Sequence, residues 1–148
     1  MMRSTSAMRF PKSKWTEQET DGYHGNEAGL QQYLEESCVM RHIEHRRITD
    51  SIWSFIKTVA SASVTKCLAH YWKDKPDLLM MIPVSDKFSL ACEIELKSHK
   101  GKLTHGQRDY AKRMPVHLCR SPRQIDEVLA EFREFACELE KMSTQEGG

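Results

Sequence analysis

The chain has 148 residues, of which 39% are hydrophobic and 29% are charged, and its formal net charge is +1. This length is enough to bury one hydrophobic core, and the composition is that of a globular domain rather than of a disordered chain. The sequence contains no apolar run long enough to span a membrane and no apolar N-terminal stretch of the signal-peptide kind, so we expect a cytoplasmic protein with no membrane partner.

The N-terminal region divides into an arm and a helix. Residues 1–26 are polar and irregular, which favours a flexible arm. Residues 27–40 carry Leu30, Leu34 and Cys38 at helical spacing, which predicts a helix with one buried side.

A second helix is predicted over residues 42–60. Its apolar stripe includes Ile48, Ile52 and Phe55, which recur at helical spacing. Glu44 lies four residues before Ile48 and is therefore predicted to point inward, where a carboxylate needs a partner such as a metal ion. The alternative is a first-turn residue that interacts favourably with the helix dipole.

The sequence contains five cysteines, which are widely spaced and lie mostly within apolar patterns. They are typical of reduced core residues rather than of a disulfide framework. Cys38 lies near His42 and His45 in the sequence, but a structural zinc site needs a fourth ligand, which this group lacks.

Two strands are predicted in the middle of the chain. Residues 76–83 form a short apolar run bounded by prolines, with Asp77 at its entrance. Residues 90–97 alternate between apolar and charged side chains, which is typical of a strand with one buried face. The polar residues between the two runs suit a hairpin turn, so we expect Asp77 to lie near Glu95 at the end of the second strand.

Charged side chains gather on one face of this second strand. Glu93, Glu95 and Lys97 alternate with apolar residues and therefore share that face. Together with Asp77 they can hold a divalent cation and a water beside it, which is the equipment of metal-dependent phosphodiester hydrolysis. The alternative is a strand whose charged face is simply exposed to solvent, which is common.

A helix is predicted after Thr104. Thr104 and Gln107 have the spacing of a capping box, in which each side chain bonds to the backbone of the other residue. Gln107 therefore has two interpretations, as a helix cap and as a side chain of the active site.

The C-terminal sequence predicts a strand and a long helix. Residues 115–120 are apolar enough for a short strand. Ser121 followed by Pro122, with Gln124 at the third helical position, is typical of a helix start. The helix carries a continuous apolar stripe of Ile125, Val128, Leu129, Phe132, Phe135, Ala136 and Leu139.

The predicted elements define the fold class. With a weaker strand pattern over residues 67–72, the order is two helices, about three strands, a helix, a strand and a helix. This order predicts an α/β fold. We expect a single domain over residues 27–141 and a tail over residues 142–148.

Basic residues follow the predicted site. The segment from Lys97 to Arg113 contains one acidic residue, Asp109, whereas residues 126–140 are mainly acidic. The cations expected to contact nucleic-acid phosphates are Lys100, Lys102, Arg108, Lys112 and Arg113. Tyr110 lies among them and is expected to pack on the substrate. The alternative for this segment is a charged surface that contacts only solvent.

The motifs occur in an order that resembles a known nuclease family. The segments Pro-Asp-Leu, Ile-Glu-Leu-Lys, Gly-Lys-Leu-Thr-x-x-Gln-x-x-Tyr and Val-His-Leu-Cys-Arg-Ser lie between residues 44 and 129. In this order and spacing they resemble the virus-type replication-repair nuclease (VRR-NUC) domain of the PD-(D/E)XK superfamily. The resemblance implies a restriction-endonuclease-like core, with a mixed β-sheet of about four strands flanked by helices.

The resemblance also implies a mechanism. Asp77, Glu95 and the backbone carbonyl of Leu96 would bind Mg²⁺ or Mn²⁺, and Glu44 would bind the metal directly or through water. Lys97 would orient the attacking water, help to deprotonate it and offset the charge that builds on the phosphate.

The same resemblance implies the partners. Gln107 would steady Lys97 or a phosphate oxygen. Small members of the family cut branched DNA such as Holliday junctions and work as homodimers, so we expect a DNA endonuclease that acts as a two-fold assembly. The alternatives are a flap or restriction-type nuclease without junction selectivity, and a catalytically silent DNA-binding or regulatory module on a nuclease fold.

Overall fold

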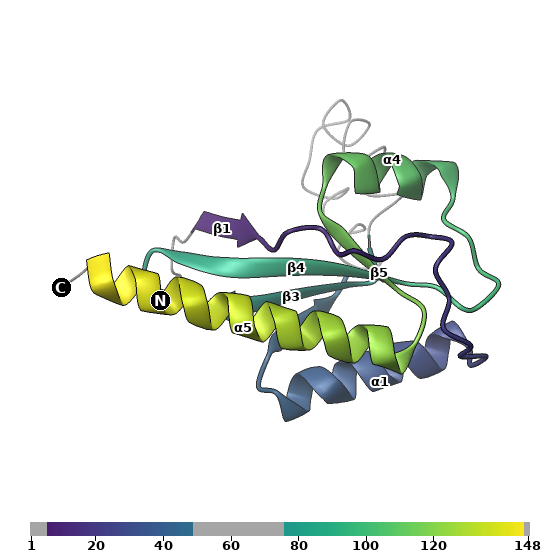
Figure 1. The fold of residues 1–148 in the computed structure, drawn as a ribbon, viewed down its shortest axis with the longest axis horizontal. Helices are drawn as coiled ribbons and strands as arrows, with labels where there is room; N and C mark the ends of the chain where they lie inside the picture. Colours follow the sequence, from purple (N-terminus) through teal and green to yellow (C-terminus); the bar gives the residue numbers. More distant parts are fainter. Residues whose placement is uncertain (1–5, 49–75, 147–148) are drawn as a thin grey trace, which may run out of the picture.

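The computed structural model describes residues 6–48 and 76–146 of the chain. In this part of the protein one five-stranded sheet is flanked by helices (Figure 1). Helices α1 (Glu27–Met40) and α5 (Pro122–Glu146) pack together on one face of the sheet, and α4 (His105–Arg113) lies on its other side. The predicted α/β fold is confirmed.

The sheet is mixed, because its central strand β4 has both parallel and antiparallel neighbours. The strands are β1 (Ser6–Arg9), β2 (Glu44–Arg47), β3 (Leu78–Pro83), β4 (Phe88–Leu96) and β5 (Val116–Cys119). β3 and β4 pair antiparallel, as the predicted hairpin requires, and β2 pairs antiparallel with β3. β1 and β5 both pair parallel with β4, one with its first half and the other with its second, so they share one edge of β4 end to end.

The core lies between the sheet and the helices α1 and α5. Alternate residues of β4 point into it, because successive side chains of a strand point to opposite faces. The largest buried apolar side chains of this core come from α1, β3, β4 and α5. They are Leu30, Leu34, Leu78, Met80, Leu90, Ile94, Leu96, Ile125, Leu129 and Phe132. The apolar stripe predicted for the last helix is therefore its contact with the sheet.

Part of the predicted arm belongs to the sheet. Residues 6–9 form β1 in register with residues 88–91 of β4, and Phe10 is 6% exposed in the core. The prediction of a flexible arm over residues 1–26 is therefore wrong for residues 6–10. Such a short strand has little pattern of its own, and its pairing with a buried neighbour determines its conformation.

The second predicted helix is wrong over residues 42–48. α1 ends at Met40, and His42 has a φ of 54°, in the left-handed region where helices often terminate. The chain then enters β2, whose backbone pairs with β3. Residues 49–60 of the predicted helix, and the strand predicted over residues 67–72, lie outside the described residues.

The last helix begins as predicted and ends later. The hydroxyl of Ser121 accepts a hydrogen bond of 3.1 Å from the backbone N–H of Gln124, and Pro122 is the first helical residue. The side chain of Gln124 accepts from the N–H of Arg120 at 2.7 Å rather than from that of Ser121. α5 continues to Glu146, so the prediction of a tail from residue 142 is wrong up to that point. No helix of the described part of the chain is long and apolar enough to cross a membrane.

None of the described cysteines forms a disulfide. Cys38, Cys92 and Cys119 are buried free thiols, as predicted, whereas Cys137 is exposed on α5. Cys67 lies outside the described residues.

Candidate active site

Asp77 and Glu95 meet at one end of the β3–β4 hairpin. The backbone N–H of Asp77 donates to the carbonyl of Ile94 at 3.0 Å, which continues the antiparallel ladder by one residue beyond β3. The Asp77 carboxylate then accepts a hydrogen bond of 2.7 Å from the N–H of Leu96. The two carboxyl groups are close enough for each to shift the pKa of the other. The predicted convergence of Asp77 and Glu95 is present in the structure.

The surroundings of these two groups disfavour negative charge. Burial raises the pKa of Asp77, against the hydrogen bond from Leu96 that lowers it, and the charge of Glu27 raises it further. Burial and the neighbouring charge of Asp77 raise the pKa of Glu95 to about 9. A buried pair of this kind holds either a shared proton or a cation, because two like charges in contact repel strongly in a site with little water.

Lys97 supplies a positive charge beside the pair. Its Nζ lies 3.8 Å from Oε1 of Glu95, and the two side chains are 13% and 8% exposed. Its backbone N–H donates to the carbonyl of Cys119, so the end of β5 fixes the residue in place. The charge of Lys97 lowers the pKa of both carboxyl groups and offsets part of the effect of burial.

Gln107 serves the helix and the site at the same time. Its Oε1 accepts from the backbone N–H of Thr104 at 2.9 Å, and its own N–H donates to the Thr104 hydroxyl at 3.1 Å, which completes the predicted capping box. Its Nε2 donates to Oε1 of Glu95 at 3.2 Å. Gln107 is therefore both a helix cap and a neighbour of Glu95, because the cap orients the amide that reaches the Glu95 carboxyl group.

Glu44 lies away from this group. It is an exposed residue of β2 and pairs with Met81, whereas Asp77 lies at the other end of the same strands, where its carbonyl accepts from the N–H of Ile48. Four residues of strand correspond to about 13 Å. The prediction that Glu44 faces inward on a helix is wrong, because the segment forms a strand in which the helical spacing to Ile48 has no meaning.

Glu27 is a carboxylate near the site that the sequence analysis missed. It is the first residue of α1, after the N-cap Asn26. Its charge contributes to the raised pKa of both Asp77 and Glu95, which places it within electrostatic reach of the pair. An acidic residue in the first turn of a helix is common and gives no separate signal in the sequence.

Glu93 and Tyr110 form a buried structural contact. The Glu93 carboxylate is paired with the Arg9 guanidinium at 2.9 Å and accepts from the Tyr110 hydroxyl at 2.8 Å. Glu93 is 5% exposed and Tyr110 4% exposed. Tyr110 lies between α4 and the sheet and also lines a cavity beside Glu95, so its packing on a substrate stays a prediction.

A cavity of about 330 Å³ lies next to Glu95 and Gln107. Its opposite wall is formed by residues 12–18, which follow β1 along the side of the sheet that carries α4 (Figure 1). Lys12 and Lys14 bring positive charge to this wall, and Lys112 of α4 brings positive charge to another part of the lining. The site is therefore open to a ligand of moderate size and is covered partly by the N-terminal segment.

The predicted cations differ in their environments. Lys100 and Lys102 are exposed on the loop between β4 and α4, and Lys112 and Arg113 are exposed in the last turn of α4. Arg108 is also on the surface, but its guanidinium is paired with an acidic residue of the N-terminal segment.

The donor set at Asp77 and Glu95 fits a hard divalent cation. Within residues 6–48 and 76–146, no three His, Cys, Asp or Glu side chains are arranged as a ready group of metal ligands. Mg²⁺ needs no such group, because one or two carboxylates commonly hold it together with waters and substrate phosphates. A cation would also relieve the repulsion that raises both pKa values. No protein-family model, curated protein or solved structure matches this chain.

Proposed function

We propose that the protein is a metal-dependent DNA endonuclease that hydrolyses phosphodiester bonds. The observation that carries this proposal is the meeting of Asp77 and Glu95 at the end of the hairpin, with Lys97 and Gln107 both in contact with Glu95. Two acidic oxygen donors and one ammonium around a single point are suited to a metal ion, a water and a phosphate together.

The metal would be held by Asp77 and Glu95, with the backbone carbonyl of Leu96 as a further donor and with Glu27 as an additional negative charge within electrostatic reach. A bound Mg²⁺ or Mn²⁺ supplies positive charge that polarises the phosphodiester and makes a water more acidic. Glu27 would take the role first assigned to Glu44, because its charge acts on both Asp77 and Glu95.

Lys97 and Gln107 would position the reactants. Lys97 can hold the attacking water, take part in its deprotonation and stabilise the negative charge that develops on the phosphate. Gln107 fixes the orientation of Glu95 through its amide and is itself held by the helix cap. Both side chains are in place before substrate arrives, which reduces the reorganisation needed at the moment of reaction.

The resemblance to the VRR-NUC domain supports DNA as the substrate, together with the basic residues near the site. The proposal assigns the chain a restriction-endonuclease-like core, with Asp77, Glu95 and Lys97 as its catalytic motif. It extends to branched DNA and a homodimer, because one domain with one site needs two copies to cut two strands symmetrically.

A cleavage assay tests the proposal directly. Linear, flap and four-way DNA are incubated with the protein in Mg²⁺, Mn²⁺ or EDTA. We expect cleavage that needs a divalent cation and is lost in Asp77→Asn. The matched control is Asp86→Asn, which makes the same change at the exposed far turn of the same hairpin. Tight DNA binding without cleavage in any metal would instead support the silent binding module.

A further inference from the structure

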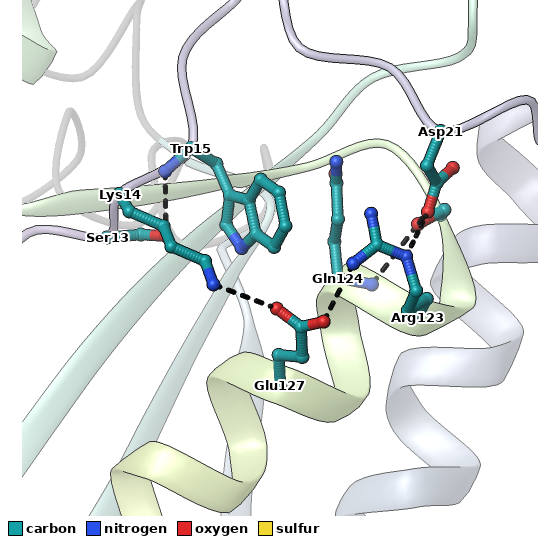
Figure 2. Close-up of polar contacts among 8 residues, drawn as sticks. Ser13, Lys14, Trp15, Asp21, Arg123, Gln124 and Glu127 are labelled. Atoms are coloured by element: carbon teal, nitrogen blue, oxygen red, sulfur yellow. Dashed lines mark hydrogen bonds and ion pairs between the residues drawn. The ribbon is translucent and has the colours of Figure 1, made fainter.

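The segment between β1 and α1 is tied down at two points on the start of α5. We call residues 12–21 the strap. Lys14 lies 3.4 Å from Glu127, and Asp21 lies 3.0 Å from Arg123 (Figure 2). Arg123 in turn contacts Glu127 at 2.7 Å, so the two anchors are linked. The part of the strap between its anchors is thereby held across the candidate active site.

Glu17, between the two anchors, accepts hydrogen bonds from two arginines. Both oxygens of its carboxylate accept from Nε of Arg108, at 3.0 and 3.1 Å. Its backbone carbonyl accepts from Nη2 of Arg120. Arg108 is 46% exposed at its side chain and Glu17 19% exposed. The ion pair is therefore partly open to water, and such pairs are individually weak.

Arg120 is a buried cation without a carboxylate of its own. The residue is 2% exposed, and its Nη1 donates to the carbonyls of Ser98 and Gly101 at 2.7 and 2.6 Å. Among the described residues, its Nε has no hydrogen-bond partner. Arg120 also forms no ion pair with any of these residues. Burial lowers its pKa, although the charges of Glu17 and Glu27 oppose this effect. A buried positive charge held only by carbonyl groups is expensive unless an anion can approach it.

A second cavity, of about 480 Å³, opens beside these arginines. It is lined by Lys100, Lys102, Arg108 and Arg120, together with Glu17, Gln18 and Thr20 of the strap and the loop after β4. Glu17, Gln18 and Arg108 also line the cavity beside Glu95. The strap and Arg108 are thus the wall that separates the catalytic cavity from the basic one.

We infer that Arg108 and Arg120, with Lys100 and Lys102, form a second phosphate subsite for the DNA backbone, and that the Glu17 carboxylate occupies this subsite in the DNA-free protein. The choice of DNA as the ligand rests on the proposed function, whereas the arrangement of the subsite comes from the contacts described above. A carboxylate is a fair substitute for a phosphate oxygen on an arginine, since both accept the same charge-assisted hydrogen bonds. Displacement of Glu17 by a phosphate would join the two cavities into one groove.

DNA binding without metal tests the subsite. Affinity for a labelled duplex is measured in EDTA, so that no cleavage occurs, for wild type, Glu17→Gln and Glu19→Gln. Glu19 is exposed two residues further along the strap, so it controls for the change in net charge. We expect Glu17→Gln to bind about three- to fivefold tighter, the scale of a lost competing surface ion pair, and Glu19→Gln to stay within about twofold of wild type. Equal affinities for the two variants would overturn the inference.

The same measurement in an Arg108→Gln background shows whether Glu17 acts through the arginine. If it does, Glu17→Gln should not increase DNA affinity in that background, because the Arg108 guanidinium for which Glu17 and a phosphate compete is absent. An equal gain in both backgrounds would mean a general charge effect and would overturn the assignment. Hydrogen exchange gives an independent readout. The strap amides should exchange faster when DNA is bound, and added protection would show that the strap stays in place.

The outcomes separate this inference from the proposed function. An Arg108-dependent gain in Glu17→Gln, without cleavage in any metal, would keep the subsite and remove the nuclease. Metal-dependent cleavage with equal affinities for Glu17→Gln and Glu19→Gln would keep the nuclease and remove the subsite. Absence of DNA binding in every variant, together with no cleavage in any metal, would overturn both.

Discussion

At the scale of single residues, the site depends on the charge state of Glu95. Its pKa of about 9 means that the carboxyl group is protonated near neutral pH when no cation is bound. A divalent cation favours the ionised form, so its binding would release this proton. Stability and pH are therefore coupled through one side chain, and the proposed metal would be coupled to both.

This coupling predicts how stability changes with pH. The pKa of Glu95 rises from 4.5 to about 9 on folding, so the folded state holds an extra proton between these values. The stabilisation is complete below about pH 4.5 and is lost as the pH rises through about 9. Thermal melts in EDTA should show this loss in wild type and not in Glu95→Gln. Glu138→Gln, exposed on α5, is the control, and parallel curves for all three proteins would contradict the prediction.

Lys97 should matter for rate more than for binding. Its ammonium lies beside Glu95, and its role in the proposed reaction is to stabilise charge that develops in the transition state. Lys97→Ala should keep most of its DNA affinity and lose about a hundredfold or more in cleavage rate. Lys87→Ala, at the far turn of the hairpin, should change neither quantity. Equal losses of affinity and rate in Lys97→Ala would make the residue a phosphate anchor.

At the scale of elements, α4 links helix capping to the candidate active site. Thr104 and Gln107 fix the first turn of the helix, and the remaining amide hydrogen of Gln107 reaches Glu95. β4 connects the site to the rest of the fold. The strand carries Glu95 of the site and also the buried Glu93, which is paired with Arg9 of β1.

Two substitutions in α4 separate capping from catalysis. Thr104→Ala removes the acceptor at the N-cap and should cost about 0.5–2 kcal/mol of stability. Gln107→Glu keeps an acceptor for the Thr104 N–H but replaces the donor to Glu95 with a carboxylate that repels it, so cleavage should fall while the helix cap is kept. Urea unfolding and cleavage rates check the two effects. Full activity in Gln107→Glu would leave this residue as a cap alone.

β1 should contribute to stability as a core element. Phe10 stacks on His117 at a centroid distance of 4.8 Å and meets Phe132 edge-on at 5.5 Å. Phe10→Ala should therefore cost about 3–5 kcal/mol. Met8→Ala, in the same strand but 42% exposed, should cost less than about 1 kcal/mol. Urea unfolding measures both, and equally small losses would mean that residues 6–10 are a loose arm.

At the scale of the whole molecule, the site is assembled from elements far apart in the sequence. Glu27 comes from α1, Asp77 precedes β3, Glu95 belongs to β4 and Gln107 to α4. The strap adds a fifth component from the N-terminal region. The packing of α1 against the sheet brings the charge of Glu27 to the other carboxyl groups.

This assembly predicts which distant carboxylate affects metal binding. Glu27→Gln should raise the Mg²⁺ concentration needed for half-maximal cleavage, because a negative charge near the pair is lost. Glu44→Gln makes the same change on an exposed strand and should leave the requirement unchanged. Metal titrations of the two variants check this. A shift in Glu44→Gln, with none in Glu27→Gln, would restore the interpretation drawn from the helical stripe.

The sequence by itself determined the local features. The hairpin, the capping box of α4, the bounds of α1 and the apolar stripe of α5 all follow from spacings within one element or between two neighbouring ones. Asp77, Glu95 and Lys97 could be brought together in advance for the same reason, because a hairpin is a short-range structure whose register fixes which residues meet.

Only the tertiary structure decided the rest. β1 and β2 are strands because they pair with buried strands that lie far away in the sequence, and four residues carry too little pattern to predict such a pairing. Glu93 and Tyr110 are buried because Arg9 arrives from β1 to neutralise the carboxylate. Glu27 joins the site through the packing of a whole helix. In each case the deciding contact joins residues distant in the chain, and a local pattern contains no information about it.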